Sequence, residues 1–185
     1  RRRPVARLCR SARGRGGRAA TGRAPRSLVR GRLRLGRDDS HKTIPNAIAE
    51  VREAIDFIRY YAEQAEKLYE NDECQSYTGE HNVTTYEARG TWMVIAPWNF
   101  PLAIFVGPIV AALLSGNTVL AKPAPQTLYV AKVTLACMYT SGVPVDALQL
   151  CDPTVEEASK AVADERINGI TFTGSHGSAK RIQRT

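Results

Sequence analysis

The sequence predicts an α/β protein built on a parallel β-sheet whose strands are joined by helices. From Thr91 onward, short β-branched and apolar runs of strand length alternate with longer apolar runs of helical length. Glycine, proline and asparagine lie between these runs and mark the turns. Strands and helices that alternate at this spacing are joined by right-handed crossovers, which produces a doubly wound sheet.

The first predicted element is an amphipathic helix that runs from Thr43 to about Tyr69. Thr43 can cap its N-terminus, and Pro45 is tolerated in a first helical turn. Apolar β-branched residues then recur at helical spacing. These residues are Ile44, Ile48, Val51, Ile55 and Ile58. We expect this helix to be a scaffold that packs on the sheet, and residues 71–90 to form a loop with a short strand.

The remaining predicted elements alternate between strands and helices. The strands are Thr91–Ile95, Thr118–Lys122, Leu148–Cys151 and Ile167–Thr173. The helices are Leu102–Ser115, Thr127–Ser141, Val155–Ala163 and Ser178–Arg184. A break is expected inside the first of these helices at Gly107 and Pro108, because proline lacks the N–H that a helix interior needs.

The composition fits one core of modest size. The chain has 185 residues, is 43% hydrophobic and contains no apolar run long enough for a membrane-spanning helix. Its four cysteines show no CxxC spacing and have no histidine companions, which argues against a zinc site and a disulfide framework. They are Cys9, Cys74, Cys137 and Cys151. We therefore expect no metal, and a reducing, cytoplasmic setting.

Positive charge is concentrated in the first 40 residues. They contain 14 Arg, no Lys and two Asp, which gives +12, whereas the other 145 residues carry 12 basic and 16 acidic side chains, which gives −4. The segment 1–41 is rich in Arg, Gly, Ala and Pro and has neither helical nor strand periodicity. Such a segment cannot build a core and is expected to be disordered.

Three explanations of this Arg-rich tail are open. A basic tail can bind nucleic acid, but such tails usually interleave aromatic residues or Lys, which the tail lacks. A transit peptide is also Arg-rich, but six Gly and two Pro disfavour its amphipathic helix. Out-of-frame translation of GC-rich DNA yields the same composition, and we favour this explanation. Translation of the upstream DNA in all three frames tests it.

The segment from Ile95 to Pro101, Ile-Ala-Pro-Trp-Asn-Phe-Pro, follows the first predicted strand. Its two prolines fix the backbone around Trp98 and Asn99, which leaves the Asn99 amide able to donate hydrogen bonds toward a ligand. Doubly wound sheets bind ligands beyond the carboxyl ends of their strands, so Asn99 is the first candidate site residue.

Two further predicted strands end in residues that can bind a ligand. Lys122 ends the second strand and is followed by the rigid Pro123. Gly174 and Ser175 follow the fourth strand and precede a helix, where free backbone N–H groups favour a phosphate. A lysine together with a Gly-Ser helix start indicates a nucleotide, although each feature alone has an ordinary structural explanation.

Taken in order, the motifs closely resemble the NAD-binding half of the aldehyde dehydrogenase superfamily. They are Ile95-Ala-Pro-Trp-Asn-Phe-Pro-Leu, Gly116-Asn-Thr-Val-Leu-Ala-Lys-Pro-Ala and Thr171-Phe-Thr-Gly-Ser. The segment from Asn46 and the run Thr78-Gly-Glu are similar to the L-glutamate γ-semialdehyde (1-pyrroline-5-carboxylate) dehydrogenase module of bifunctional bacterial proline utilisation proteins. The resemblance covers about Lys42 to Arg184 and implies an incomplete, Rossmann-like doubly wound sheet.

The resemblance implies roles for individual residues. Asn99 would help form the oxyanion hole when a cysteine thiolate attacks the aldehyde. Lys122 would bind the adenosine ribose of NAD, and Gly174 and Ser175 would lie at its pyrophosphate. The wall beside the cofactor would be formed by Ile95, Ala96, Pro97 and Trp98. In this family reaction the semialdehyde is oxidised to glutamate in proline catabolism, with NAD as the hydride acceptor.

The resemblance also implies what the sequence lacks. The family's catalytic cysteine, general-base glutamate and oligomerisation segments would lie beyond Thr185, so residues 42–185 are expected to be an inactive fragment of a homo-oligomeric parent. Pro125 stands where the family usually has a Glu that shares the ribose with the lysine. In the family, further amphipathic helices precede the helix that begins near Ile44, which is why we favour an out-of-frame tail.

Two functions from different classes follow. The first is the cofactor-binding part of an NAD-dependent semialdehyde dehydrogenase. The second is a non-catalytic protein whose tail binds nucleic acid, with the α/β part as a scaffold or nucleotide sensor. We favour the enzyme fragment.

Overall fold

Four parallel strands form one sheet in the order β3-β2-β1-β4. They are β1 (Thr91–Ile95), β2 (Thr118–Lys122), β3 (Leu148–Leu150) and β4 (Ile167–Phe172). From β1 to β3 each new strand is added on the same side, and the chain then returns to place β4 on the other side of β1. The predicted α/β class with a parallel sheet is confirmed.

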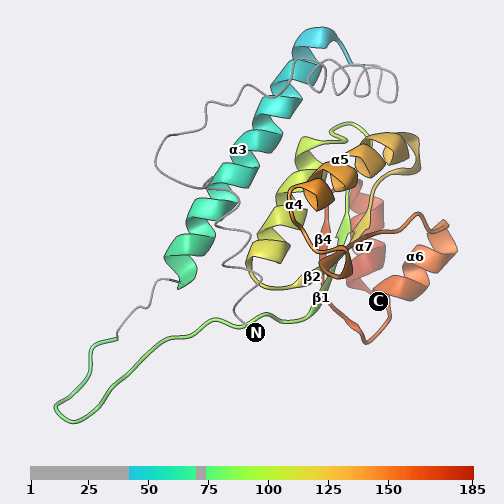
Figure 1. The fold of residues 1–185 in the computed structure, drawn as a ribbon. Helices are drawn as coiled ribbons and strands as arrows, with labels where there is room; N and C mark the ends of the chain where they lie inside the picture. The colour runs from blue at the N-terminus through green and yellow to red at the C-terminus, as the bar shows by residue number, and fades with distance from the viewer. Residues whose placement is uncertain (1–41, 70–73) are drawn as a thin grey trace.

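The computed structural model shown in Figure 1 describes residues 42–69 and 74–185. The predicted Arg-rich tail, residues 1–41, lies outside the described residues, and so does the beginning of the predicted loop 71–90. Residues 74–90 form an extended arm that projects from the body of the molecule (Figure 1). In the described ranges, no helix combines the length and the hydrophobicity needed to span a membrane.

Five α-helices and two short 3-10 helices occupy the described residues. The α-helices are α3 (Ile44–Tyr69), α4 (Ala103–Leu114), α5 (Leu128–Thr140), α6 (Val155–Val162) and α7 (His176–Gln183). The 3-10 helices are η1 (Pro125–Thr127) and η2 (Val145–Ala147). Helices α4 and α5 lie on one side of the sheet and α6 and α7 on the other (Figure 1). This follows from the reversal in strand order, because right-handed crossovers then place their helices on opposite faces.

The main core lies between the sheet and helices α4 and α5. Phe105 and Ile109 of α4 are fully buried and pack in one cluster with residues from three strands. The strand residues of this cluster include Val94, Val119, Ala121 and Leu148. Alternate residues of a strand face the same side of a sheet, so Val119 and Ala121 of β2 both reach this core.

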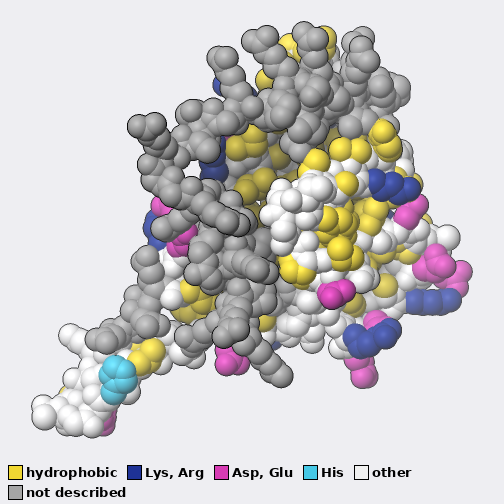
Figure 2. Space-filling model, viewed as in Figure 1, with side chains coloured by type: hydrophobic (Ala, Val, Ile, Leu, Met, Phe, Trp, Pro, Cys, Tyr) yellow, Lys and Arg dark blue, Asp and Glu magenta, His cyan; other side chains and the backbone are white. Residues whose placement is uncertain are grey.

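Helix α3 packs on α4, so the prediction that this helix packs on the sheet is wrong. The buried apolar residues of α3 are alanines, Ala47, Ala54 and Ala65, whereas Ile44 and Ile48 are 55% and 42% exposed. Small side chains let two helices approach closely, so the alanines and not the larger isoleucines occupy the contact. Figure 2 shows hydrophobic side chains on the surface over α4 and α5 as well.

The predicted break in the following helix is also wrong, because α4 runs without interruption through Pro108. Nine of its 12 residues are buried, so packing on both sides holds the helix despite the hydrogen bond that proline removes. Gly107 contributes to this packing, since a Cβ at this position would lie 3.3 Å from the ring of Phe57 on α3.

At the amino edge of the sheet, the side chain of Asn117 joins three segments. Its Oδ1 accepts hydrogen bonds from the backbone N–H groups of Arg89 (2.8 Å) and Gly90 (3.1 Å). Its Nδ2 donates to the carbonyl of Ala112 near the end of α4 (3.3 Å). Gly90 has φ +129°, a conformation that L-residues with a side chain rarely adopt. The entry into β1 therefore depends on a buried amide from the turn before β2.

Replacement of Asn117 by alanine should lower the free energy of unfolding by roughly 2–3 kcal/mol, because two backbone N–H groups lose their acceptor. Urea unfolding followed by circular dichroism measures this loss. Gln64→Ala, on the exposed side of α3, is the control and should change stability by less than about 0.5 kcal/mol. An equal effect of the two substitutions would contradict the assigned role of Asn117.

Candidate functional site

The carboxyl ends of three strands lie level with one another. In the parallel register, Ile95 at the end of β1 pairs with Lys122 at the end of β2 and with Phe172 at the end of β4. Beyond the strands, the backbone N–H of Ala96 donates to the carbonyl of Lys122 (3.1 Å), and that of Thr173 donates to the carbonyl of Ile95 (3.0 Å). All three predicted site segments therefore emerge at one edge of the sheet.

The reversal in strand order falls between β1 and β4. The chain leaves β1 toward α4 on one face and leaves β4 toward α7 on the other, so the two outgoing connections separate (Figure 1). The Asn99 loop follows β1, and Gly174 with Ser175 follows β4, so these segments lie beyond the two strands between which the order reverses. This is the position at which open α/β sheets bind their ligands.

The loop after β1 is held at its ends and exposed in its middle. Pro101 is buried and Ala96 is 6% exposed, whereas Trp98 is 58% exposed. Asn99 is exposed too, and within the described residues its side-chain amide makes no hydrogen bond. The amide therefore has no competing partner in this part of the chain, and its donation to a ligand stays a prediction.

Lys122 is half-buried at the end of β2. Its Nζ makes one long hydrogen bond, 3.5 Å to the carbonyl of Pro123, and retains N–H groups for a ligand. Pro123 is fully buried and fixes the turn from which the lysine extends. Pro125 opens the 3-10 helix η1 and is exposed.

Ser175 caps helix α7. Its Oγ accepts a hydrogen bond from the backbone N–H of Ser178 (3.3 Å) and lies 3.0 Å from the Ser178 Oγ. The predicted helix start at Ser178 is thus two residues late, because α7 begins at His176. Gly174 is required locally as well, since a Cβ there would lie 2.6 Å from the ring of Phe172.

Among the described residues, no group of three or more His, Cys, Asp or Glu side chains is arranged to hold a metal ion. What the carboxyl edge offers is an ammonium group, the N-terminus of a helix and a free amide. These groups favour an anionic ligand such as a dinucleotide.

A family model described as the aldehyde dehydrogenase family matches residues 34–185. The chain belongs to the aldehyde dehydrogenase family. The match starts earlier than the predicted boundary near Lys42, and its first residues, 34–41, lie outside the described part of the chain. The Rossmann-like parallel sheet that the resemblance implies is found in the described residues.

Individual relatives refine the placement in the aldehyde dehydrogenase family. The chain is 44% identical over 147 residues to the bifunctional protein PutA of Klebsiella aerogenes, covering 79% of this chain and 10% of that protein. It is 34% identical over 145 residues to a 1-pyrroline-5-carboxylate dehydrogenase of Staphylococcus aureus, covering 78% of this chain and 28% of that protein. A solved bifunctional proline utilization A (PutA) protein superposes with a TM-score of 0.88 at 36% identity, covering 99% of this chain and 18% of the other.

The chain thus spans about a tenth of the PutA relative and 28% of the dehydrogenase relative. It is similar to the aldehyde dehydrogenase part of PutA and to 1-pyrroline-5-carboxylate dehydrogenases.

Cys151 lies directly after β3, beyond the carboxyl end of that strand. Its Sγ lies 3.5 Å from the carbonyl of Ala121. Burial raises the pKa of the Cys151 thiol to about 11, an effect that the charge of Asp152 adds to and that of Lys122 opposes. The group is therefore a thiol at neutral pH, which supports its predicted role as a passive residue and not a nucleophile.

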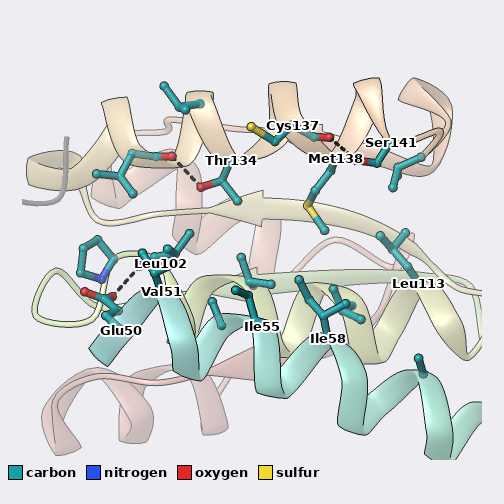
Figure 3. Close-up of a pocket in the computed structure, with 18 of the residues that line it drawn as sticks. Glu50, Val51, Ile55, Ile58, Leu102, Leu113, Thr134, Cys137, Met138 and Ser141 are labelled. Atoms are coloured by element: carbon teal, nitrogen blue, oxygen red, sulfur yellow. Dashed lines mark hydrogen bonds between the residues drawn. The ribbon is translucent and has the colours of Figure 1, made fainter. Parts of the chain in front are cut away.

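One polar residue that sequence reasoning did not single out is Glu50 of α3. Its side chain is buried at 4% exposure and accepts a hydrogen bond from the backbone N–H of Leu102, at the exit of the Asn99 loop (Figure 3). The sequence does contain an indication of this role. Glu50 lies three residues after Ala47 and four before Ala54, so a carboxylate interrupts a stripe of alanines at helical spacing.

An apolar groove with a volume of about 400 Å³ lies between α3, α4 and α5. Figure 3 shows residues that line it. Glu50 and Leu102 lie at one end of it, but it contains none of the predicted site residues. The groove and the carboxyl edge of the sheet are therefore separate features.

With a pKa of about 11, only roughly one Cys151 in a thousand is a thiolate at pH 8. Iodoacetamide should therefore label Cys151 slowly in the folded chain, and the rate should increase as the pH rises toward 11. Labelling in urea should be fast. Peptide mass spectrometry measures both rates, with the exposed Cys74 as internal reference. Labelling of Cys151 as fast as Cys74 at pH 8 would show that Cys151 is reactive.

Proposed function

We propose that residues 42–185 are the N-terminal part of the NAD-binding domain of an L-glutamate γ-semialdehyde (1-pyrroline-5-carboxylate) dehydrogenase. The observation that carries the proposal is the common edge at which Asn99, Lys122 and Ser175 lie, at the reversal in strand order. Its finer part, the substrate, rests on the similarity to PutA and to 1-pyrroline-5-carboxylate dehydrogenase. Such an enzyme oxidises the semialdehyde to glutamate in proline catabolism.

The groups at the carboxyl edge fit a dinucleotide. The Lys122 ammonium retains donors for ribose hydroxyl groups, and the first turn of α7 presents backbone N–H groups to a pyrophosphate. The exposed ring of Trp98, with Ile95, Ala96 and Pro97, forms one wall of the site. When bound, NAD supplies the acceptor for the hydride that leaves the substrate.

Asn99 contributes to the chemical step through its free amide. An oxyanion develops on the substrate when a thiolate attacks the aldehyde carbon, and a preorganised N–H donor stabilises that charge more than the ground-state carbonyl. The amide has no competing partner among the described residues, so no hydrogen bond has to break before it donates. Loss of one such donor typically reduces kcat by about 100- to 1000-fold.

NAD is the cofactor we propose, although aldehyde dehydrogenases as a family use NAD or NADP. An acidic residue on the ribose 2′-hydroxyl group selects for NAD in dinucleotide folds. Because position 125 is proline, η1 places no acidic residue there beside the Lys122 ammonium. The ammonium group can also bind the 2′-phosphate of NADP. We therefore expect NAD to bind with only modest preference over NADP.

We predict that Lys122→Ala weakens NAD binding by about 10- to 100-fold, because a charge-assisted hydrogen bond contributes about 1.5–3 kcal/mol. Isothermal titration calorimetry on the full chain, with NAD and NADP in parallel, measures the effect. Lys132→Ala, which removes an exposed lysine from α5, is the matched control and should leave both affinities unchanged.

Deletion of Arg1 to Asp39 should also leave NAD binding unchanged. If instead the chain binds RNA or DNA in a salt-sensitive manner that this deletion abolishes, and binds no dinucleotide, the nucleic-acid alternative is correct.

We expect no oxidation of L-glutamate γ-semialdehyde by the 185-residue chain itself. None of its four cysteines matches the family's nucleophile, and Cys151, which follows β3, is a neutral thiol at neutral pH. The formation of NADH, followed by its absorbance in the presence of the semialdehyde, tests this. Turnover that survives replacement of all four cysteines by serine would exclude a thiol mechanism, and turnover lost with one of them would identify the nucleophile.

A further inference from the structure

The charged side chain of Glu50 lies buried in the contact between α3 and α4. It lies in the second turn of α3, and its carboxylate reaches the beginning of α4 (Figure 3). Its Oε1 accepts hydrogen bonds from the backbone N–H groups of Leu102 (2.8 Å) and Ala103 (3.3 Å). A carboxylate is not buried without partners of this kind, so these contacts define what Glu50 does.

Helix α4 has no N-cap of its own. The residue at the cap position, Leu102, offers no side-chain hydrogen bond, and the first turn contains no acidic residue. The first N–H groups of a helix need acceptors, and negative charge is favourable there because of the helix dipole. Glu50, 52 residues earlier in the chain, supplies both the acceptor and the charge.

Lys42 extends this contact to the Asn99 loop. Its Nζ lies 2.7 Å from Glu50 Oε2, and the two side chains are only 12% and 4% exposed. The same Nζ lies 4.2 Å from the centre of the Phe100 ring. A cation at this distance over an aromatic face is attracted to it. The ammonium group therefore joins α3 to the residue that directly follows Asn99.

These contacts hold the loop from the side opposite the sheet. On the sheet side, backbone hydrogen bonds fix Ile95 and Ala96. On the other side, Lys42 contacts Phe100 and Glu50 binds Leu102. Asn99 lies between these anchors in a loop bounded by two prolines, so its backbone has few conformations left.

We propose that Glu50 and Lys42 are positioning residues, which hold the loop so that the Asn99 amide faces the carboxyl edge of the sheet. The inference rests on the proposed role of Asn99 as an oxyanion donor. Neither residue touches the substrate in this assignment. Their effect is to keep the donor in place before the reaction, which is the condition for electrostatic stabilisation of a transition state.

The test uses the full chain labelled with ¹⁵N and observes the Asn99 side-chain amide and the Trp98 indole by NMR. Glu50→Gln should lower the heteronuclear NOE of both groups and speed hydrogen exchange at Leu102 and Ala103 by ~10-fold or more. Glu63→Gln is the matched control. It makes the same change on the same helix, in an ion pair with Lys67 that is 63% and 61% exposed, and should change neither signal.

A second pair of variants retains the Glu50 cap. Lys42→Met keeps the apolar stem and removes the cation, whereas Lys42→Arg keeps a cation that can stack on Phe100. The heteronuclear NOEs of the Asn99 amide and the Trp98 indole should fall in Lys42→Met. In Lys42→Arg they should return toward the values of the parent chain. Thermal unfolding of each variant is measured in parallel. It separates increased mobility of the Asn99 loop from a general loss of stability, which would affect the whole fold.

Two failures are distinguishable. If Glu50→Gln and Lys42→Met leave the Asn99 and Trp98 signals unchanged while NAD still binds, the positioning role is wrong and the proposed function stands. If the loop loosens as expected but NAD does not bind the parent chain, the contacts are correct and the proposed function is wrong.

Discussion

The constraint on which the rest of the structure depends is the position of β1 between β2 and β4. Because all pairs are parallel and in register at their carboxyl ends, the three connecting turns emerge at one edge. Because the strand order reverses at β1, the outgoing helices α4 and α7 lie on opposite faces of the sheet (Figure 1). The topology of the sheet thus determines where the candidate site lies, and the residue types determine what it can bind. Lys122 and Ser175 are distant in sequence, and only the shared partner strand brings their segments together.

The contact between α3 and α4 adds an electrostatic link to this arrangement. Alanines let the helices approach, and Glu50 lies in their contact where the first backbone N–H groups of α4 need acceptors. A charge in such a contact is favourable only when it is paired and hydrogen-bonded. Here one carboxylate oxygen accepts from two N–H groups and the other pairs with an ammonium group. The scaffold helix is therefore connected to the proposed catalytic loop by polar contacts, and not by apolar packing alone.

The sequence predicted the fold class and most elements because strand and helix periodicities are local and strong. It also predicted that Asn99, Lys122, Gly174 and Ser175 lie at one edge, because the carboxyl ends of parallel strands lie at the same edge of a sheet. The α3 contact was not predictable from hydrophobicity, which favoured the isoleucines although the shape of the contact requires alanines. Glu50 was missed for a related reason. A charged residue on a helix is expected to face solvent, and only the three-dimensional neighbour, the start of α4, shows why it does not.

The return of the chain to β1 also affects the order in which the sheet can assemble. Strands β1, β2 and β3 pair with their neighbours in the order in which the ribosome produces them. The other edge of β1 stays open until β4 is made, when the Asn168 side chain can accept from the N–H of Thr91, 77 residues earlier. At synthesis rates of about 5–20 residues per second, this edge is unprotected for roughly 4–15 s. During that interval the unpaired edge of β1 is available to other chains, and synthesis of β4 covers it.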